Sequence, residues 1–293
     1  GCAKKRFENY KQQPLEFVFD KSFTGKLSQF GLDPNRRTPS GIKAAIIREK
    51  GTNGEREMAY MLYLAGFDVK DVTMTDLISG RETLEDINMV VYCGGFSNSD
   101  VLGSAKGWAG SFLFNPKAKA ALDNFYARED TLSLGVCNGC QLMMELGLIT
   151  PEDKKKGKML HNDSHKFESN FLGVTVPMNR SVMFGSLSGS KLGIWVAHGE
   201  GKFSLPYPED HYNVVLKYSY DEYPGNPNGS DYSVAGIASQ DGRHLAMMPH
   251  LERACFPWEN AYYPLDRKNE DQITPWMEAF VNARKWVEAN RKK

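Results

Sequence analysis

The sequence predicts an α/β fold with a doubly wound, mostly parallel sheet that carries an antiparallel extension. Short apolar runs alternate with helical patterns up to residue 150, and this alternation is typical of parallel strands covered by helices. The runs contain few charged residues, as strands buried on both faces do. After the lysine-rich stretch 154–158, strand-like runs dominate, so we expect the later strands to form an antiparallel extension or edge.

The predicted elements begin at residue 42. Residues 42–47 form an apolar run typical of a strand, the glycines of 51–54 indicate a loop, and the apolar spacing of 58–65 predicts a helix. Further strands are predicted at 67–72, 87–93 and 132–136, and further helices at 117–126 and 139–148. The predicted antiparallel strands lie at 172–176, 192–196, 214–220, 234–239 and 244–248, followed by a closing amphipathic helix at 274–291.

Residues 1–40 lack this pattern. They combine the basic residues Lys4, Lys5 and Arg6 with a short apolar patch at 15–19 and a turn-rich stretch at 33–40. We therefore predict that 1–40 is an arm or linker and that 41–293 is one folded domain. Because the chain begins with Gly, we expect it to be a processed product or a piece of a longer protein, with the apolar patch in a docking surface.

Composition and charge argue against several classes of function. Thirty-six Lys and Arg balance 36 Asp and Glu, unlike the basic excess of proteins that bind nucleic acid or anionic lipid. No apolar stretch approaches the roughly 18 residues of a membrane span. Five cysteines are an odd number, which favours free thiols in a reducing compartment. We predict a cytoplasmic protein with no nucleic-acid or membrane partner.

Cys137 is the strongest candidate for a reactive side chain. It stands between Gly135 and Gly139, after an apolar strand and before a helix, and this is the pattern of a nucleophile elbow. A helix N-terminus lowers the pKa of a thiol, and its free N–H groups, here that of Asn138, can bind an oxyanion. The alternative is a buried structural cysteine beside a glycine turn, which the spacing disfavours.

Cys137 and Cys140 also form a C-x-x-C pair, which permits a zinc or redox site. Zinc needs two further ligands at suitable spacing, and His161 and His165 are only a loose candidate pair. A redox dithiol usually follows the first strand of its fold, whereas this pair lies deep in the chain. We expect no metal site, and we expect Cys140 to be packed in the core.

His250 is the best candidate for the base that such a cysteine needs. It follows the apolar run 244–248, and Glu252 lies two residues later. In an extended segment these two side chains point the same way, so the carboxylate can orient the imidazole. The alternative is an ordinary surface pair of histidine and glutamate.

The glycines Gly94 and Gly95 follow another predicted buried strand. They allow the backbone before Phe96 to approach a substrate and turn an N–H group toward it, as the second donor of an oxyanion hole. On this dipeptide alone, an ordinary glycine turn is the simpler explanation.

Together these motifs resemble the class I glutamine amidotransferases, and among them the glutaminase domains of phosphoribosylformylglycinamidine synthases, which act in purine biosynthesis. The similarity runs from about residue 42 to the last helix and rests on five ordered segments: 51–57, 93–97, 135–141, 197–201 and 248–250. It implies a flavodoxin-like sheet, and it implies that 1–40 joins this domain to a synthetase region.

The resemblance implies hydrolysis of glutamine through a glutamyl thioester on Cys137. His250 and Glu252 complete the triad, and Gln141, His198 and Gly199 help to hold the α-amino and carboxylate groups of glutamine. The ammonia passes to a synthetase domain or subunit, where ATP and Mg²⁺ drive conversion of formylglycinamide ribonucleotide to the amidine. No cofactor is implied in this chain.

One segment departs from the family, and two alternatives to this function stay open. The family continues the 94–97 motif with Tyr-Gly-Asp, whereas this chain has Asn98, Ser99 and Asp100, so we expect a different loop there. One alternative is a cysteine hydrolase or peptidase of the same architecture, which would need neither the 51–57 nor the 197–201 motif. The other is an inactive docking module, which is disfavoured by the intact triad.

Overall fold

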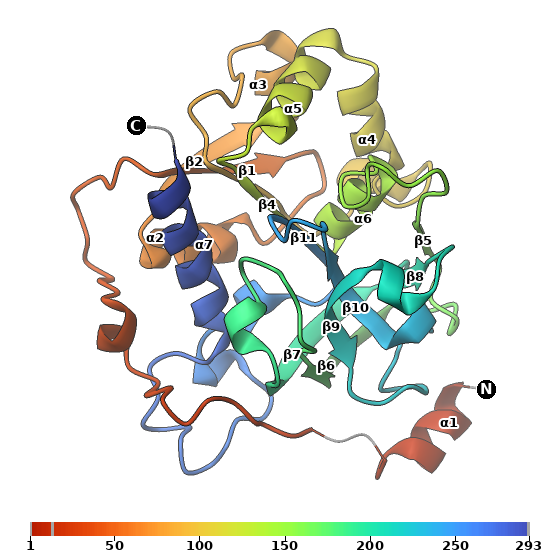
Figure 1. The fold of residues 1–293 in the computed structure, drawn as a ribbon. Helices are drawn as coiled ribbons and strands as arrows, with labels where there is room; N and C mark the ends of the chain where they lie inside the picture. Colours follow the sequence, from red (N-terminus) through yellow and green to blue (C-terminus); the bar gives the residue numbers. More distant parts are fainter. Residues whose placement is uncertain (1, 13–14, 292–293) are drawn as a thin grey trace.

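A central sheet runs through the computed structural model, which describes residues 2–12 and 15–291. Within these residues the sheet has nine strands in the order β2-β1-β3-β4-β11-β10-β9-β6-β7 (Figure 1). Strands β1, β2, β3, β4 and β11 are parallel, and the remaining four continue the sheet in antiparallel fashion. The bounds are β1 Lys43–Arg48, β2 Asp68–Thr73, β3 Met89–Tyr92, β4 Leu132–Val136, β6 Glu168–Thr175, β7 Lys191–His198, β9 Asn213–Tyr218, β10 Val234–Ala238 and β11 His244–Met247.

Helices cover both faces of the sheet, which confirms the predicted α/β class. Figure 1 shows α2 and α7 on one side, with α3, α4, α5 and α6 on the other. Every residue of β3 and β4 is buried, as expected for apolar strands between two helical layers. A small separate sheet pairs β5 with β8. The remaining bounds are α2 Glu55–Ala65, α3 Met74–Ser79, α4 Lys106–Leu113, α5 Pro116–Ala127, α6 Asn138–Glu145, α7 Trp276–Asn290, β5 Lys158–Leu160 and β8 Lys202–Ser204.

The prediction that 244–248 belongs to the antiparallel extension is wrong in one respect. β11 pairs antiparallel with β10 but parallel with β4, with Met247 opposite Val136. It is therefore the last parallel strand, because the chain returns through the extension and re-enters the sheet beside β4. Its carboxyl end lies next to that of β4, which brings the segment after Met247 close to Cys137.

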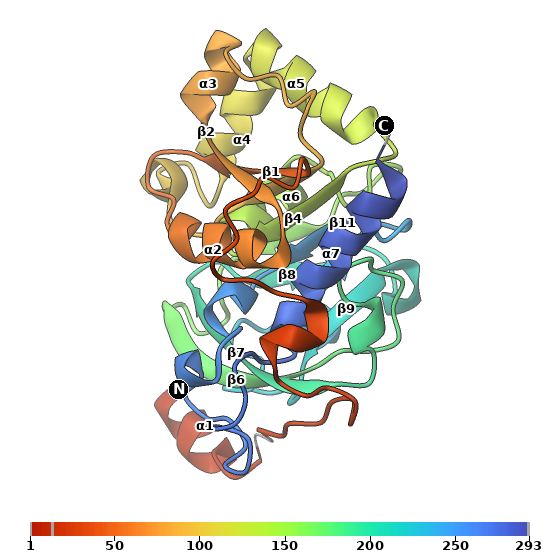
Figure 2. The ribbon, with the colours of Figure 1, turned by 90° about the vertical axis from the view of Figure 1, so that its left-hand side faces the viewer.

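The N-terminal segment is more ordered than an arm would be. A short helix, α1 (Cys2–Asn9), is attached through Arg6, which contacts Glu168 and the Tyr223 hydroxyl, and through Asn9, which donates to the Tyr223 carbonyl. Residues 15–40 then follow the outside of the molecule before the chain enters β1 (Figure 2). Within the described ranges, no helix has the length and apolarity that a membrane crossing requires.

The aromatic side chains of the apolar patch 15–19 pack against this domain and do not form the predicted docking surface. Val18 exchanges two backbone hydrogen bonds with Lys191 at the edge of the sheet, of 2.8 and 2.7 Å. Phe17 and Phe19, on either side of it, pack against the domain's own core. Alternation along an extended segment thus directs both rings inward. Whether residues 1–40 join this domain to another one stays a prediction.

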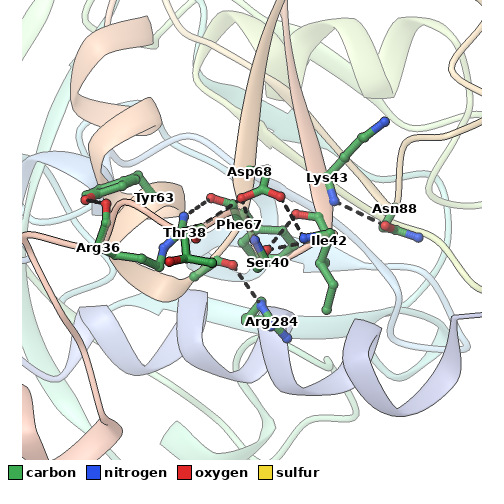
Figure 3. Close-up of polar contacts among 12 residues, drawn as sticks. Arg36, Thr38, Ser40, Ile42, Lys43, Tyr63, Phe67, Asp68, Asn88 and Arg284 are labelled. Carbon is green, nitrogen blue, oxygen red and sulfur yellow. Dashed lines mark hydrogen bonds and ion pairs between the residues drawn. The ribbon is translucent and has the colours of Figure 1, made fainter.

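Asp68, the first residue of β2, anchors the end of this segment. Its carboxylate accepts hydrogen bonds from the backbone N–H groups of Ser40 and Gly41, at 2.9 and 2.7 Å, and pairs with Arg36 at 3.0 Å (Figure 3). Arg36 also donates to the Phe67 carbonyl. Although partial burial opposes ionisation, these hydrogen bonds and the Arg36 charge lower the pKa of Asp68. The charged form therefore fastens the segment to the sheet edge.

We expect Asp68→Asn to lower the free energy of unfolding by about 1–2 kcal/mol at neutral pH, because charged hydrogen bonds are replaced by weaker ones. A lowered pKa gives stability that is present above the unfolded value of 3.8 and is lost as the pH falls through the folded value. Urea unfolding from pH 7 to pH 3 should show the difference from wild type shrinking at acid pH. Asp71 lies on β2 like Asp68 and forms a surface ion pair with Arg48 of β1. Asp71→Asn is therefore the control and should change little.

Candidate active site

The candidate site lies where the parallel strands end. The segments after β1, β3, β4 and β11 meet at this edge, and they carry Thr52, Gly94, Cys137 and His250. Ligands of open α/β sheets bind at the carboxyl ends of the strands. The topology thus assembles the motifs that lie far apart in the sequence.

Cys137 has the backbone of a nucleophile elbow. Its φ and ψ angles are 52° and −106°, a conformation rarely adopted by residues with a side chain. The turn also needs Gly139, where an added Cβ would lie 2.0 Å from the Tyr92 carbonyl oxygen. Cys137 is 5% exposed and its Sγ lies 3.5 Å from the Ala197 carbonyl oxygen. Cys140 is fully buried, as expected, and burial raises the pKa of its thiol.

His250 and Glu252 form a buried pair beside this cysteine. His250 Nδ1 lies 2.7 Å from Glu252 Oε1, and the two residues are 2% and 1% exposed. The prediction that an extended segment brings them together is wrong, because residues 251–253 form a turn of 3₁₀ helix. Burial opposes protonation of the imidazole, but the Glu252 carboxylate and the hydrogen bond with Cys137 outweigh it and raise the pKa of His250 to about 9.

Gly94 lies against both reactive side chains. A Cβ at this position would be 2.8 Å from His250 Cε1 and 3.4 Å from Cys137 Cβ. Only a glycine lets the turn after β3 approach them so closely. The turn therefore forms one wall around the cysteine and the histidine.

Two backbone N–H groups near Cys137 are free to bind an oxyanion. The N–H of Asn138 is the first of helix α6, where no preceding carbonyl is available. Gly95 N–H has no acceptor within the described residues, whereas Phe96 N–H donates to the Gly51 carbonyl at 2.8 Å. Of the three predicted positions 94–96, Phe96 is thus excluded as a donor, whereas Gly95, which lines the pocket, can offer one.

His198 is buried beside the site as a neutral imidazole. Asn162 Oδ1 accepts the N–H of Gly201 at 3.0 Å and lies 3.1 Å from His198 Nδ1, so Nδ1 carries the proton. Burial and the nearby charge of His250 lower the pKa of His198 to about 3. Its Nε2 is a buried acceptor without a partner among the described residues.

Cys137, Gly95, His198 and Gly199 help to line a pocket of about 450 Å³. The carboxylates of Asp100 and Glu200 line the pocket as well, and burial followed by the nearby Glu200 raises the pKa of Asp100. Basic and aromatic side chains complete the wall: His161, His165, Lys166, Phe96 and Phe167. The two rings meet at 5.9 Å. The pocket presents a cysteine, two carboxylates and several basic side chains to one shared space.

Residues 41–287 match the family model of the CobB/CobQ-like glutamine amidotransferase domain. The chain belongs to this family. The match covers nearly all of the sheet and its helices.

Curated relatives of this glutamine amidotransferase domain are phosphoribosylformylglycinamidine synthases. The human protein of that name is 44% identical over 86% of this chain, and the probable chloroplastic/mitochondrial one of Arabidopsis thaliana is 44% identical over 84%. The chain spans only about one fifth of their length, 21% and 19% respectively. Among solved structures, a chain of PurLQS from Thermotoga maritima aligns over 86% of this chain and 99% of its own, with 26% identity and a TM-score of 0.60.

Gln141 lines the pocket through an amide that also bonds within the protein, and the glutamine-binding role that the resemblance implies for it stays a prediction. Its Oε1 accepts from Asn138 Nδ2 and its Nε2 donates to the Glu200 carbonyl, both at 2.8 Å. Asn138 Oδ1 in turn accepts the N–H of Ser97 at 3.0 Å. Through these bonds, Gln141 and Asn138 link helix α6 to the loops that contain Ser97 and Glu200.

The metal interpretation of the C-x-x-C pair finds no support in the geometry. Within residues 2–12 and 15–291, no group of three or more His, Cys, Asp or Glu side chains is arranged to hold a metal ion. His161 and His165 lie on the pocket wall, while Cys140 is buried in helix α6. The two pairs do not form one ligand set.

Sequence reasoning missed the charged side chains of the pocket. Asp100 lies in the segment that departs from the family, and Glu200 lies inside a segment that the resemblance included, but neither was assigned a role. For Asp100 and Glu200, the signal in the sequence was an acidic residue in or beside one of the recognised segments. Lys166 carried no comparable signal, because it stands in a loop whose path depends on the tertiary structure.

Proposed function

We propose that this domain hydrolyses glutamine to glutamate and ammonia, and that it supplies the ammonia to a synthetase region that makes formylglycinamidine ribonucleotide with ATP. The observation that carries the proposal is Cys137 on a strained elbow, facing a pocket and backed by the His250–Glu252 pair. Family membership and the names of the curated relatives support the substrate and the pathway.

The geometry suits acyl transfer through a thioester. The Cys137 thiolate attacks the side-chain amide carbon, and the charge that develops on the amide oxygen is bound by the N–H groups of Asn138 and Gly95. Imidazolium His250 donates its proton to the amide nitrogen as the C–N bond breaks, which releases ammonia. Water then adds to the thioester while His250 takes its proton, and glutamate leaves with the thiol regenerated.

The pocket's charges suit the two ends of a free amino acid. Glu200 Oε2 accepts the Ser104 N–H at 3.2 Å, which holds this carboxylate in place, and one oxygen of Asp100 is buried without a partner in the described residues. Both carboxylates would bind the α-ammonium of glutamine, while Lys166 and His165 would attract its α-carboxylate. His198 Nε2 adds a neutral acceptor.

We expect Glu200→Gln to raise KM for glutamine roughly 10- to 100-fold with a smaller effect on kcat, because a charged hydrogen bond contributes about 1.5–3 kcal/mol. Wild type should discriminate strongly against Nα-acetylglutamine, and the variant should discriminate less. Glu209→Gln, in an ion pair with Lys217 away from the pocket, serves as the control. Unchanged discrimination in Glu200→Gln would assign the α-ammonium to another group.

The acceptor half of the reaction belongs to another region. ATP and Mg²⁺ act in the synthetase under this proposal, and this domain needs no cofactor of its own. Residues 1–40 would link the two parts, and a cytoplasmic location remains a prediction. Delivery without loss requires that glutamine hydrolysis respond to the state of the synthetase.

Intact-mass spectrometry after incubation with a diazo-ketone analogue of glutamine tests the proposal directly. We expect one adduct, mapped to Cys137, together with release of glutamate from unmodified glutamine. A cysteine peptidase would instead cleave internal peptide bonds and spare free glutamine. An inactive docking module would give neither adduct nor glutamate, even when the synthetase region and its substrates are supplied, and that result would refute the proposal.

A further inference from the structure

The segment 51–57 contacts two parts of the candidate site, the turn at 94–96 and the region of the His250–Glu252 pair. At its start, the Gly51 carbonyl accepts the Phe96 N–H at 2.8 Å, and Asn53 N–H donates to the Gly94 carbonyl at 2.9 Å. These two bonds fix the peptide planes on either side of Gly95. The segment 51–57 therefore sets the direction of the Gly95 N–H.

The same segment also binds Arg253, the residue that follows Glu252 of the proposed triad. Arg253 Nη2 donates to Asn53 Oδ1 at 3.0 Å, and Arg253 Nε lies 3.5 Å from Glu57 Oε1. The same Nε is 3.9 Å from Glu252 Oε1. The backbone at Gly54 passes so close that an added Cβ would lie 3.0 Å from Arg253 Nη2. The guanidinium is thus clamped between the segment and Glu252.

Glu252 needs such a partner. Its carboxylate is buried, its Oε1 faces both His250 and Arg253, and its Oε2 has no hydrogen-bond partner within the described ranges. A buried carboxylate is costly unless opposite charge compensates it. Among the described residues, the charged and titratable groups near Glu252 and His250 are Arg253, Cys137 at the start of α6, His198 at the end of β7, Cys93 after β3, Glu57 in α2, Cys255 and Glu259.

We infer that Arg253 is a positioning residue that holds the triad carboxylate and joins it to the segment that shapes the oxyanion-binding turn. The inference rests on the proposed triad. Through Asn53 and Glu57, the orientation of Glu252 and the direction of Gly95 N–H depend on one and the same segment. A displacement of 51–57 would disturb both at once.

Arg253 also gives the triad a contact with the outer surface. The side chains of Arg253 and Glu57 are 30% and 44% exposed, and neither residue lines the glutamine pocket. A partner that changed this ion pair would act on catalysis without entering the pocket. The site is thereby open to control from a side that glutamine does not occupy.

The test compares Arg253→Ala with Arg253→Lys. Removing a positive charge raises the pKa of nearby acids, so the acid limb of kcat/KM and of Cys137 alkylation by iodoacetamide should move about half to one pH unit upward in Arg253→Ala. Arg253→Lys keeps the charge and should leave the limb in place. Arg81→Ala, which breaks an exposed ion pair with Asp76, is the matched control. Peptide mapping separates Cys137 from the partly exposed Cys2.

Glu57→Gln is a second variant, and it should shift the acid limb in the opposite direction. Loss of the negative charge should move the limb to lower pH, and the exposed position on α2 makes misfolding a poor explanation of that result. An unmoved limb in Arg253→Ala, or equal shifts in the alanine and lysine variants, would overturn the inference. Alkylation requires no glutamine chemistry, so shifted alkylation profiles without glutamate release would refute the proposed function and leave the role of Arg253 standing.

Discussion

We expect replacement of Cys137 with alanine to abolish the proposed release of glutamate from glutamine and to leave the domain folded. Under the proposed mechanism the thioester forms on this sulfur, and no other described cysteine lines the pocket. Loss of the nucleophile of a catalytic triad costs roughly 10⁵- to 10⁶-fold in rate. The fold should tolerate the change, because alanine fits the space of the thiol and the turn is held by the backbone hydrogen bond from Cys137 N–H to the Met247 carbonyl at 2.9 Å.

Cys140→Ala is the matched control for this substitution. Cys140 lies on the same helix and is fully buried without pocket contact, so its loss should cost stability but spare turnover. Glutamate release and the analogue adduct would be measured on all three proteins, with thermal melting as the folding check. An adduct that persists in Cys137→Ala, or that moves to another cysteine in wild type, would contradict the assignment.

The elbow could be predicted because its chemistry is local. A cysteine between two glycines, after an apolar strand and before a helix, leaves few conformations open to the chain, and with the observed φ of 52° the Cys137 side chain lines the pocket. The buried strands β3 and β4 were predictable for a similar reason, because their composition alone requires burial on both faces.

The direction of β11 was not predictable in this way. Apolar composition indicates a strand but not its neighbours, and pairing with β4 is set by packing over more than 100 residues of chain separation. The backbone conformation between His250 and Glu252 was also not predictable, because an extended segment and a 3₁₀ turn can both bring these side chains together. The two side chains do meet as predicted, but through a different backbone geometry.

The N-terminal segment shows a third limit. Its turn-rich composition indicated a linker, yet Asp68 and Lys191 bind its backbone. Backbone hydrogen bonds leave almost no trace in the sequence, since any residue supplies them. The helix α3 was missed although Thr73 and Asp76 form a capping box there, because six residues are too few for a clear apolar period.

His250→Ala should stop catalysis almost as completely as loss of Cys137, whereas Glu252→Ala should retain measurable turnover. In the proposed mechanism His250 both receives the thiol proton and protonates the leaving amide nitrogen, so its loss should cost roughly 10⁵- to 10⁶-fold, against about 10⁴-fold for the orienting carboxylate. Single-turnover formation of the thioester and steady-state release of glutamate separate the two variants. His250→Gln, with a similar volume and no titratable group, checks that the effect is chemical.

Glu252→Gln should also change the pH dependence. Burial alone disfavours the imidazolium, and the Glu252 carboxylate is the main group that raises the pKa of His250 to about 9. Without that charge the pKa of His250 falls, so the imidazolium that donates to ammonia is lost at lower pH, and the alkaline limb of kcat should move down from about pH 9. If Glu252→Gln were as inactive as His250→Ala at every pH, the carboxylate would take part in proton transfer itself. An alkaline limb that stayed near pH 9 would instead mean that Cys137, and not Glu252, sets the charge of the imidazole.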